Sequence, residues 1–174
     1  ELFEEFEIEI CRPVFERFGL VYYGCCDPLD RKMKQVRKIP NLRKVSMSPW
    51  VDEELGASEI GRDCVYSRKP NPALLAWPEF KEQAVREHLQ ASVDVCARHG
   101  CPLELILKDI STVNYQPQRL WRWAEIAMEV VGAAGPGRTA VAGGGPGPAV
   151  RKACEQQPAS GEERICRCGK VSSS

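Results

Sequence analysis

The sequence lacks the features of several common classes of protein. It has no apolar run of the roughly 20 residues that a membrane-spanning helix needs, and no basic and apolar secretory signal near Glu1. Its 24 basic and 24 acidic residues balance, so the chain has no net field that would attract nucleic acid. We therefore expect neither a membrane nor a nucleic acid as a partner.

Histidine is also scarce. The two histidines, His88 and His99, fall within and at the end of one expected helix, and we interpret both as structural or surface residues. Cysteine is abundant, with nine residues. An odd count that includes an adjacent pair is not typical of a secreted disulfide framework and favours a reducing cytoplasm. There Cys11, Cys64 and Cys96 are expected to be small buried apolar residues.

Apolar spacing predicts four units in which a strand is followed by a helix. A helix over residues 2–18, kinked near Pro13, precedes the first unit. The strands are expected at residues 20–23, 45–47, 64–67 and 103–107. The helices that follow them are expected from Asp27, as N-cap, to Pro40, then up to Gly61, over residues 78–100 and over residues 117–131.

Strands that alternate with helices in this way predict a parallel sheet with right-handed crossovers. Eight such units form a barrel of about 250 residues, of which four are half. A small doubly wound sheet is the alternative, although no glycine-rich phosphate-binding turn follows any strand. Because helical spacing is already established at Leu2 and Phe3, we expect the domain to be truncated at its N-terminus.

Residues 132–174 differ in composition from the rest. Seven glycines, three prolines and five alanines fill most of residues 132–150. Such a stretch buries too little apolar surface to offset its chain entropy, so we expect a disordered tail. Cys166 and Cys168 lack the spacing of a zinc ribbon. Our hypothesis is that the tail is foreign to the domain and arises from a shifted reading frame.

Parallel α/β proteins bind ligands at the carboxyl ends of their strands. Cys25 and Cys26 follow the first expected strand, directly before an expected helix N-terminus, where the helix dipole favours a thiolate. A thiolate at this position binds a metal such as zinc or acts as a nucleophile. The alternative is that both cysteines are small packing residues.

The loops after the other three strands carry charged and polar groups. Arg68 and Lys69 are candidates to clamp a carboxylate or phosphate of a small-molecule substrate. Lys108 and Asp109 are candidates for an acid–base pair, or for an ion pair with each other. For each of these charges, a solvated position at the rim is the alternative. The expected substrate-binding set is completed by Ser48, Trp50 and Asn71.

Three segments carry a resemblance to a known family: residues 46–61, which begin SMSPWVD; residues 68–75, RKPNPALL; and residues 100–107 followed by 116–120, QPQRL. The first segment resembles the strand and helix that precede a Gly-Asn-x-Asp-Pro loop. The second resembles that loop, with Asn71 in place of Asp. The third resembles a final strand and the Thr-Pro-x-x-x-Leu start of the helix after it. These motifs are similar to the uroporphyrinogen decarboxylase-like superfamily. The resemblance implies that residues 1–131 form the C-terminal half of a TIM (β/α)8 barrel.

The superfamily includes the decarboxylase of haem synthesis and zinc-dependent, corrinoid-linked methyltransferases. In the methyltransferases a His-x-Cys motif and a later cysteine hold zinc. Here Cys25 matches the first cysteine, Tyr23 stands at the histidine, Cys26 is an extra thiol and no cysteine follows the last strand, so the implied ligands are Cys25, Cys26 and Asp109. The histidine of the decarboxylase's Gly-His-Gly turn is absent too.

The resemblance therefore implies a methyltransferase-type enzyme that acts with a corrinoid, a corrinoid protein or a thiol methyl acceptor. Uroporphyrinogen decarboxylation is one alternative. The other is an inactive fragment that needs its missing barrel half, or a second copy of itself, for any activity.

Overall fold

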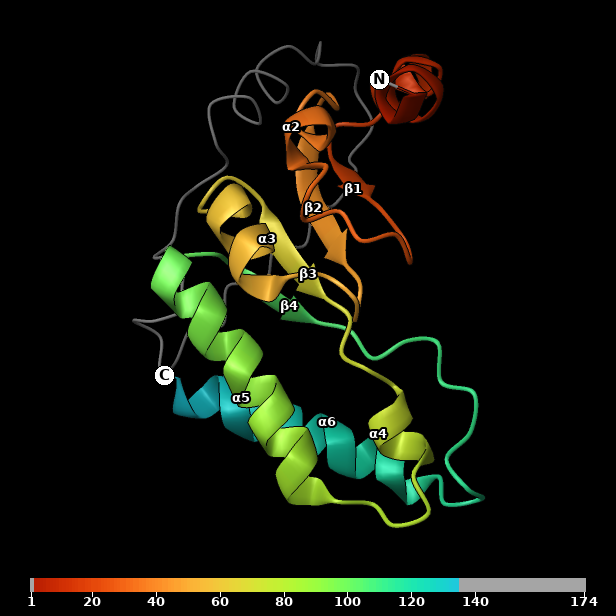
Figure 1. Ribbon diagram of the computed structural model, residues 1–174, viewed down its shortest axis with the longest axis vertical. Coiled ribbons are helices and arrows are strands. Elements are labelled where there is room, and N and C mark those ends of the chain that lie inside the picture. Colours follow the sequence, from red (N-terminus) through yellow and green to blue (C-terminus); the bar gives the residue numbers. More distant parts are fainter. Residues whose placement is uncertain (1, 135–174) are drawn as a thin grey trace, which may run out of the picture.

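The computed structural model describes residues 2–134, in which helices alternate with four parallel strands (Figure 1). Neighbouring strands pair in the order β1-β2-β3-β4 and every pair is parallel, which confirms the predicted parallel α/β arrangement. The strands are β1 (Val21–Tyr23), β2 (Leu42–Met47), β3 (Val65–Arg68) and β4 (Leu103–Leu105).

Seven helical segments accompany the sheet in this part of the chain. Two of them, separated near Pro13 as predicted, precede β1, and α6 begins after Pro117 as predicted. None of the helices in residues 2–134 is both long and apolar enough to cross a bilayer. They are η1 (Glu4–Glu9), α1 (Arg12–Phe15), α2 (Met33–Val36), α3 (Glu53–Ile60), α4 (Ala73–Ala76), α5 (Glu82–His99) and α6 (Gln118–Ala133).

The predicted tail lies almost wholly outside the described residues. The exception is its start, because α6 continues to Ala133, two residues beyond the predicted domain boundary at 131.

Two predicted helix starts are wrong. The helix predicted from residue 78 begins at Glu82, and the separate short helix α4 before it was not predicted. The other error is the start of α2. Asp27 does not cap a helix: α2 begins at Met33, after Lys32, and has no side-chain cap. The carboxylate of Asp27 instead forms an ion pair with Lys32, at 2.7 Å. The intervening chain turns so that Leu29 is buried in the core and Asp30 accepts a hydrogen bond from the backbone of the loop before α3. Burial of Leu29 thus outweighs the local helix signal.

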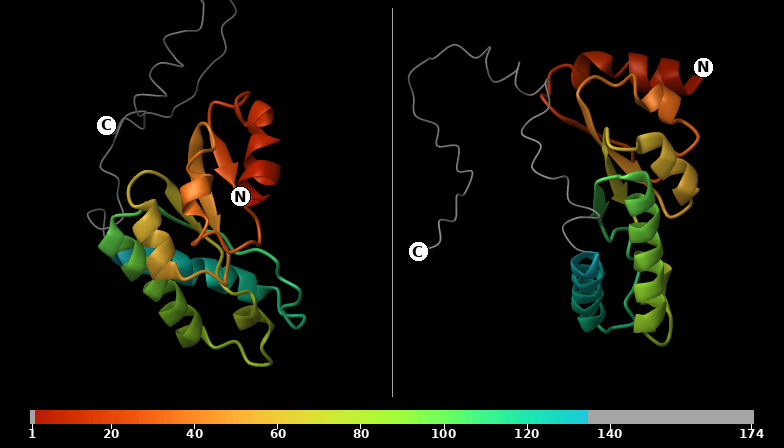
Figure 2. Two further views of the ribbon diagram at one scale, coloured as in Figure 1. Left: turned by 45° about the horizontal axis from the view of Figure 1, so that its top comes forward. Right: turned by 90° about the vertical axis from the view of Figure 1, so that its left-hand side faces the viewer.

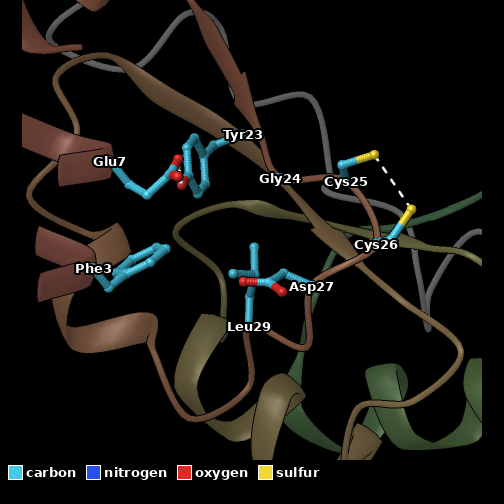
Figure 3. A pocket seen from close by; sticks show the side chains of 8 residues that line it. All are labelled: Phe3, Glu7, Tyr23, Gly24, Cys25, Cys26, Asp27 and Leu29. Carbon is cyan, nitrogen blue, oxygen red and sulfur yellow. Dashed lines mark hydrogen bonds between the residues drawn. The ribbon is translucent and has the colours of Figure 1, made fainter. Parts of the chain in front are cut away.

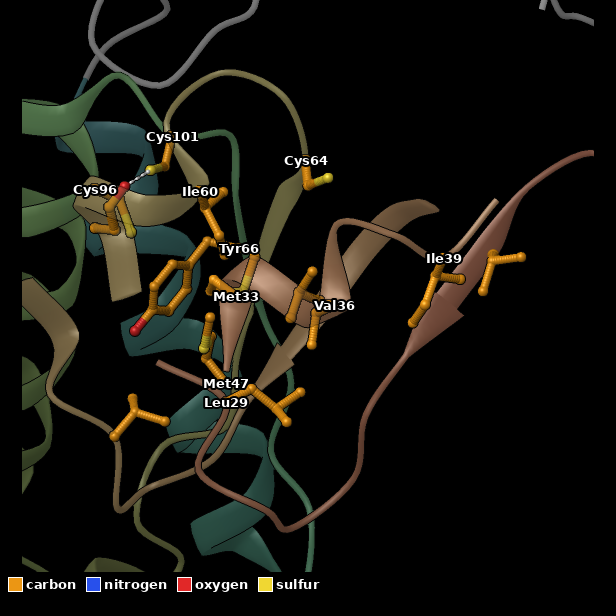
Figure 4. Packing of buried hydrophobic residues seen from close by; sticks show 14 of the residues in the cluster. Leu29, Met33, Val36, Ile39, Met47, Ile60, Cys64, Tyr66, Cys96 and Cys101 are labelled. Atoms are coloured by element: carbon orange, nitrogen blue, oxygen red, sulfur yellow. Dashed lines mark hydrogen bonds between the residues drawn. The ribbon is translucent and has the colours of Figure 1, made fainter. Parts of the chain in front are cut away.

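Alternate strand residues point toward the helices and form the core. Val45 and Met47 of β2 and Tyr66 of β3 are fully buried against side chains of α2 and α3 (Figure 4). A second cluster joins β4 to α5 and α6 and contains Leu89 and Ile126, both fully buried. Burying one such side chain contributes about 1.5–3 kcal/mol, so these contacts fix the helices to this face of the sheet.

The N-terminal segment buries less than its apolar spacing suggests. Ile8 is buried, and Phe3 and Phe15 pack edge-on against the ring of Tyr23. An outward stripe with a spacing of four residues stays more than half exposed: Leu2, Phe6, Ile10, Val14 and Phe18.

The other face of the sheet is polar. We call this face the open face. Its side chains come from the strand positions that alternate with the core residues: Tyr22, Lys44, Ser46, Ser67 and Glu104. In Figure 1 the helices α2, α3 and α5 lie in front of the strands, and the side view in Figure 2 shows α3 and α5 to one side of them. Within residues 2–134, α2, α3 and α5 therefore lie on one face of the sheet, and α6 packs against α5 and β4.

Candidate functional site

Two segments far apart in the sequence meet beyond the ends of the strands. Cys25 and Cys26 follow β1, and Lys108 and Asp109 follow β4, at the opposite edge of the sheet. The ammonium group of Lys108 lies 3.5 Å from the sulfur of each cysteine, and the sulfurs are 3.4 Å apart. We call these four residues the thiol site.

Asp109 holds Lys108 in this position. Its carboxylate lies 3.1 Å from the ammonium group and accepts a hydrogen bond from Cys26 at 3.8 Å. The backbone of Asp109 has a φ of 57°, in the left-handed region that aspartate tolerates better than most residues. This turn brings the carboxylate back beside Lys108, so the predicted pairing of the two residues is present.

The electrostatics of the thiol site distinguish the two cysteines. The hydrogen bond with Cys26, followed by the hydrogen bond and the charge of Lys108, lowers the pKa of Cys25. The same thiol–thiol hydrogen bond raises the pKa of Cys26. The hydrogen bond with Asp109 is the main cause that raises the pKa of Lys108 and keeps it a cation. The first proton to leave the pair therefore comes from Cys25, and the second leaves at higher pH.

The prediction that a helix dipole favours a thiolate at Cys25 and Cys26 is wrong. Because α2 begins at Met33, neither cysteine stands at a helix N-terminus. The positive charge that favours a thiolate comes from Lys108, a residue 83 positions away from Cys25. Sequence spacing alone gives no sign of that contact.

The expected zinc ligands do not form a complete set here. Among residues 2–134, no group of three histidine, cysteine, aspartate or glutamate side chains is placed to hold a metal ion. The Lys108 cation also lies beside both sulfurs, where it would repel a metal ion. The thiol site as it stands does not fit zinc, and we derive no chemistry through a metal.

A pocket of about 530 Å³ lies next to the thiol site, between η1 and β1. Figure 3 shows Phe3, Glu7, Tyr23 and Leu29 on one side of the chain, with both cysteine sulfurs pointing away from them. Burial, followed by the nearby charge of Glu7, raises the pKa of Tyr23 to about 12. The thiols therefore belong to the rim of the pocket.

The five predicted substrate-binding residues are not gathered at one place. Arg68 is buried and donates to Glu53, Ser92 and the carbonyl of Ser48, so its guanidinium serves the fold. Lys69 points to the open face instead, where it donates to the hydroxyls of Tyr22 and Ser67.

The other three candidates have local roles. Ser48 is fully buried, and its hydroxyl accepts a weak hydrogen bond of 3.4 Å from the backbone of Trp50. The side chain of Trp50 is 73% exposed. The side-chain oxygen of Asn71 accepts from the backbone N–H of Ala73 at 3.0 Å, at the start of α4. The structure thus connects only Lys69, of the five, to the open face.

The histidines and two of the three isolated cysteines have the positions that the sequence predicts. His88 is half-buried in α5, and burial, followed by the charge of Arg68, lowers its pKa. His99 pairs with Glu54 at the surface. Cys64 and Cys96 are buried as predicted, whereas Cys11 is only partly buried.

Sequence reasoning missed the polar residues of the open face. Lys44 and Glu104 form an ion pair of 2.6 Å, and the hydroxyl of Ser67 donates to Glu104 at 2.8 Å. Ser46 donates to the carbonyl of Cys25 at 3.0 Å, which connects this face to the thiol site. A signal was present, because each of these residues alternates with an apolar core residue in its strand.

Comparison of the chain with protein-family models, with curated proteins and with solved structures finds no match. The resemblance to the uroporphyrinogen decarboxylase-like superfamily therefore stays a prediction from the sequence segments that carry it.

Proposed function

We propose that residues 1–131 form the C-terminal half of a TIM (β/α)8 barrel of the uroporphyrinogen decarboxylase-like superfamily. The strand order supports this proposal, because the four strands follow one another in sequence order and the crossover helices α2, α3 and α5 lie on one face. A doubly wound sheet instead reverses its strand order and carries helices on both faces. In a closed barrel, β1 and β4 would each pair with a further strand.

We also propose that the thiol site makes this protein a methyltransferase-type enzyme with Cys25 as the nucleophile. The observation that carries the proposal is the position of Lys108, 3.5 Å from both sulfurs. An adjacent cation stabilises a thiolate, and the thiolate is the reactive form of cysteine.

Apart from the methyl donor, this chain provides every group that the methyl-transfer step needs. The sulfur of Cys25 gives an electron pair to the methyl carbon, and a sulfur–carbon bond forms. The bond between that carbon and its leaving group breaks, and its electron pair departs with the leaving group. Lys108 stabilises the thiolate before the step, and Asp109 holds Lys108 in place.

A corrinoid, when bound, would supply or accept the methyl group. The nearest pocket opens on the side of β1 away from which both sulfurs point (Figure 3). The described residues therefore offer no binding pocket for a corrinoid at the thiols, and because both cysteines are exposed, a corrinoid would reach them only from solvent or on a docking protein. A corrinoid protein docking at this rim would bring the methyl group, and Cys25 itself is the thiol that accepts it.

The first test is the rate at which iodoacetamide alkylates Cys25, measured against pH by peptide mass spectrometry. Because only the thiolate reacts, the rate rises as pH increases through the pKa of Cys25. We expect this rise at lower pH than for an ordinary cysteine, and we expect Lys108→Met to move it to higher pH. Lys34→Met, which alters an exposed lysine on α2, is the matched control. An identical profile for Cys25 in Lys108→Met and in the control would refute the role of Lys108.

The second test addresses the methyl group. Anaerobic incubation of the full chain with methylcobalamin is expected to add one methyl group to Cys25, detected by mass spectrometry of its peptide. Cys25→Ser is expected to remain unmodified at that peptide. A chain whose Cys25 is rapidly alkylated but never methylated would retain the thiolate and refute methyl transfer.

Porphyrinogen decarboxylation is a second candidate, favoured by one observation. Lys44 lies on the open face and Lys108 lies beyond its end, and both are partly exposed, so two ammonium groups are accessible to the carboxylates of an acidic substrate. Decarboxylation of uroporphyrinogen that persists in Cys25→Ser would favour this candidate over methyl transfer.

A further inference from the structure

A second reactive group lies on the open face, and it does not involve the thiols. The hydroxyl of Tyr22 lies 2.9 Å from that of Ser67 and accepts a hydrogen bond from the ammonium group of Lys69. Lys69 also donates to Ser67, at 2.8 Å. Lys69 is 4% exposed and Ser67 is fully buried, whereas Tyr22 is 47% exposed. A molecule from solvent therefore reaches this group at Tyr22.

Charge around this group favours a negative oxygen on Tyr22. The carboxylate of Glu104 is already paired with Lys44 and accepts a hydrogen bond from the Ser67 hydroxyl. The hydrogen bonds of Lys69 go instead to the two hydroxyls, one of them that of Tyr22. Burial raises the pKa of Tyr22, but the hydrogen bonds at its hydroxyl, first among them the one donated by Lys69, outweigh burial, so this pKa lies below its ordinary value.

The position of Tyr22 also suits a role at the end of the strands. It stands three residues before Cys25, and Ser46, which contacts Tyr22, donates to the carbonyl of Cys25. The open face carries the ammonium groups of Lys44 and Lys69 and the carboxylate of Glu104, which leaves one positive charge in excess. A small molecule with a carboxylate or carbonyl oxygen has the complementary charge for this surface.

We propose that Tyr22 is a proton-transfer residue for a small carboxylate or carbonyl compound bound over the open face, with Lys69 as its positioning residue. The O–H bond of Tyr22 breaks and its electron pair stays on the oxygen as a phenolate. The proton forms a new bond with an electron pair of the substrate's carbon or oxygen. Lys69 holds the phenolate, and water returns the proton.

The experiment is covalent labelling of tyrosines in the full chain by phenylmethanesulfonyl fluoride, with the modified peptides quantified by mass spectrometry. This reagent reacts with the phenolate, and each unit by which a pKa falls raises the phenolate fraction about tenfold well below that pKa. We expect Tyr22 to react several-fold faster than Tyr115, which is fully exposed, and faster than Tyr23, which contacts Glu7. A rate for Tyr22 no greater than that for Tyr115 overturns the proposal and needs no variant.

Two variants test the part of Lys69. Lys69→Met removes the cation and is expected to lower the rate at Tyr22 to that of Tyr115 or below, and Lys69→Arg is expected to restore much of it. A purely structural Lys69 would leave the rate at Tyr22 unchanged in Lys69→Met, which would overturn its role. Lys34→Met serves again as the control on α2.

Protection of Tyr22 from labelling tests the class of ligand. Benzoate, used as a simple carboxylate probe, is expected to slow the labelling of Tyr22 and to leave Tyr115 unchanged. Equal labelling with and without benzoate overturns the carboxylate assignment. Because these measurements read tyrosine and not thiol chemistry, they fail or succeed independently of the methyltransferase proposal.

Discussion

Arg68 provides a direct test of how the strand ends are built. Sequence reasoning treated it as an anion clamp at the rim, whereas its guanidinium is buried between the sheet and the helices α3 and α5. It pairs with Glu53, donates to the carbonyl of Ser48 at 2.7 Å and donates to the hydroxyl of Ser92 at 3.3 Å. Arg68→Met keeps most of the aliphatic stem and removes all three of these interactions.

The size of the effect follows from what the substitution leaves behind. A hydrogen bond to a charged group contributes about 1.5–3 kcal/mol, and breaking a buried ion pair from one side costs about 3–5 kcal/mol. Glu53 keeps 22% of its side-chain surface in contact with solvent, which relieves part of the penalty. We therefore expect Arg68→Met to lower the free energy of unfolding by about 3–4 kcal/mol, a large share of the roughly 5–15 kcal/mol typical of a domain.

The measurement is urea unfolding followed by tryptophan fluorescence. The ring of Trp123 is buried, so its emission changes when the domain unfolds. Arg122→Met is the matched control, because Arg122 pairs with three carboxylates on the exposed surfaces of α5 and α6. We expect a much smaller loss of stability for the control. If Arg68→Met and the control lose equally little, Arg68 is not buried in an ion pair and the packing of α3 and α5 on β3 is incorrect.

Two further substitutions test the packing beside the thiol site and within the core. Gly24→Ala is expected to lower the free energy of unfolding by about 1–3 kcal/mol, because Gly24 has a φ of 103° and an added Cβ would lie 2.6 Å from a Leu29 methyl group; unchanged urea unfolding would contradict this. Tyr66→Phe is expected to change stability by less than about 0.5 kcal/mol, or to increase it, because the buried hydroxyl has no hydrogen-bond partner within residues 2–134. A loss above about 1 kcal/mol in the same assay would show that this hydroxyl is bonded.

Much of the fold follows from the sequence because its signals are local. Alternation of Val45 and Met47 with polar neighbours identifies β2, and Pro117 marks the start of α6. The start of α2 is harder to predict, because Asp27 and Pro28 form a strong local capping signal that the burial of Leu29 overrides. Such a competition between local preference and packing is decided only in the folded chain.

The candidate site is less predictable for a different reason. The identity of Cys25 and Lys108 as candidates follows from their place after a strand, but their contact depends on the path of the chain after β4. Arg68 and Lys69 are neighbours in the sequence and lie on opposite faces, because consecutive strand residues alternate. A tyrosine such as Tyr22 is identified only once Lys69 is seen to reach its hydroxyl.

The contact between Lys108 and the cysteine pair has a consequence for how the domain assembles. It joins residues 83 positions apart and spans the whole width of the sheet, so it closes one of the longest loops in this domain. Long loops are closed late, after the local pairings have reduced the entropy that remains to be lost. Fast reaction of the Cys25 thiol is therefore expected only in a chain that has completed its folding. The time at which this reactivity appears during refolding would measure the last step of the folding pathway.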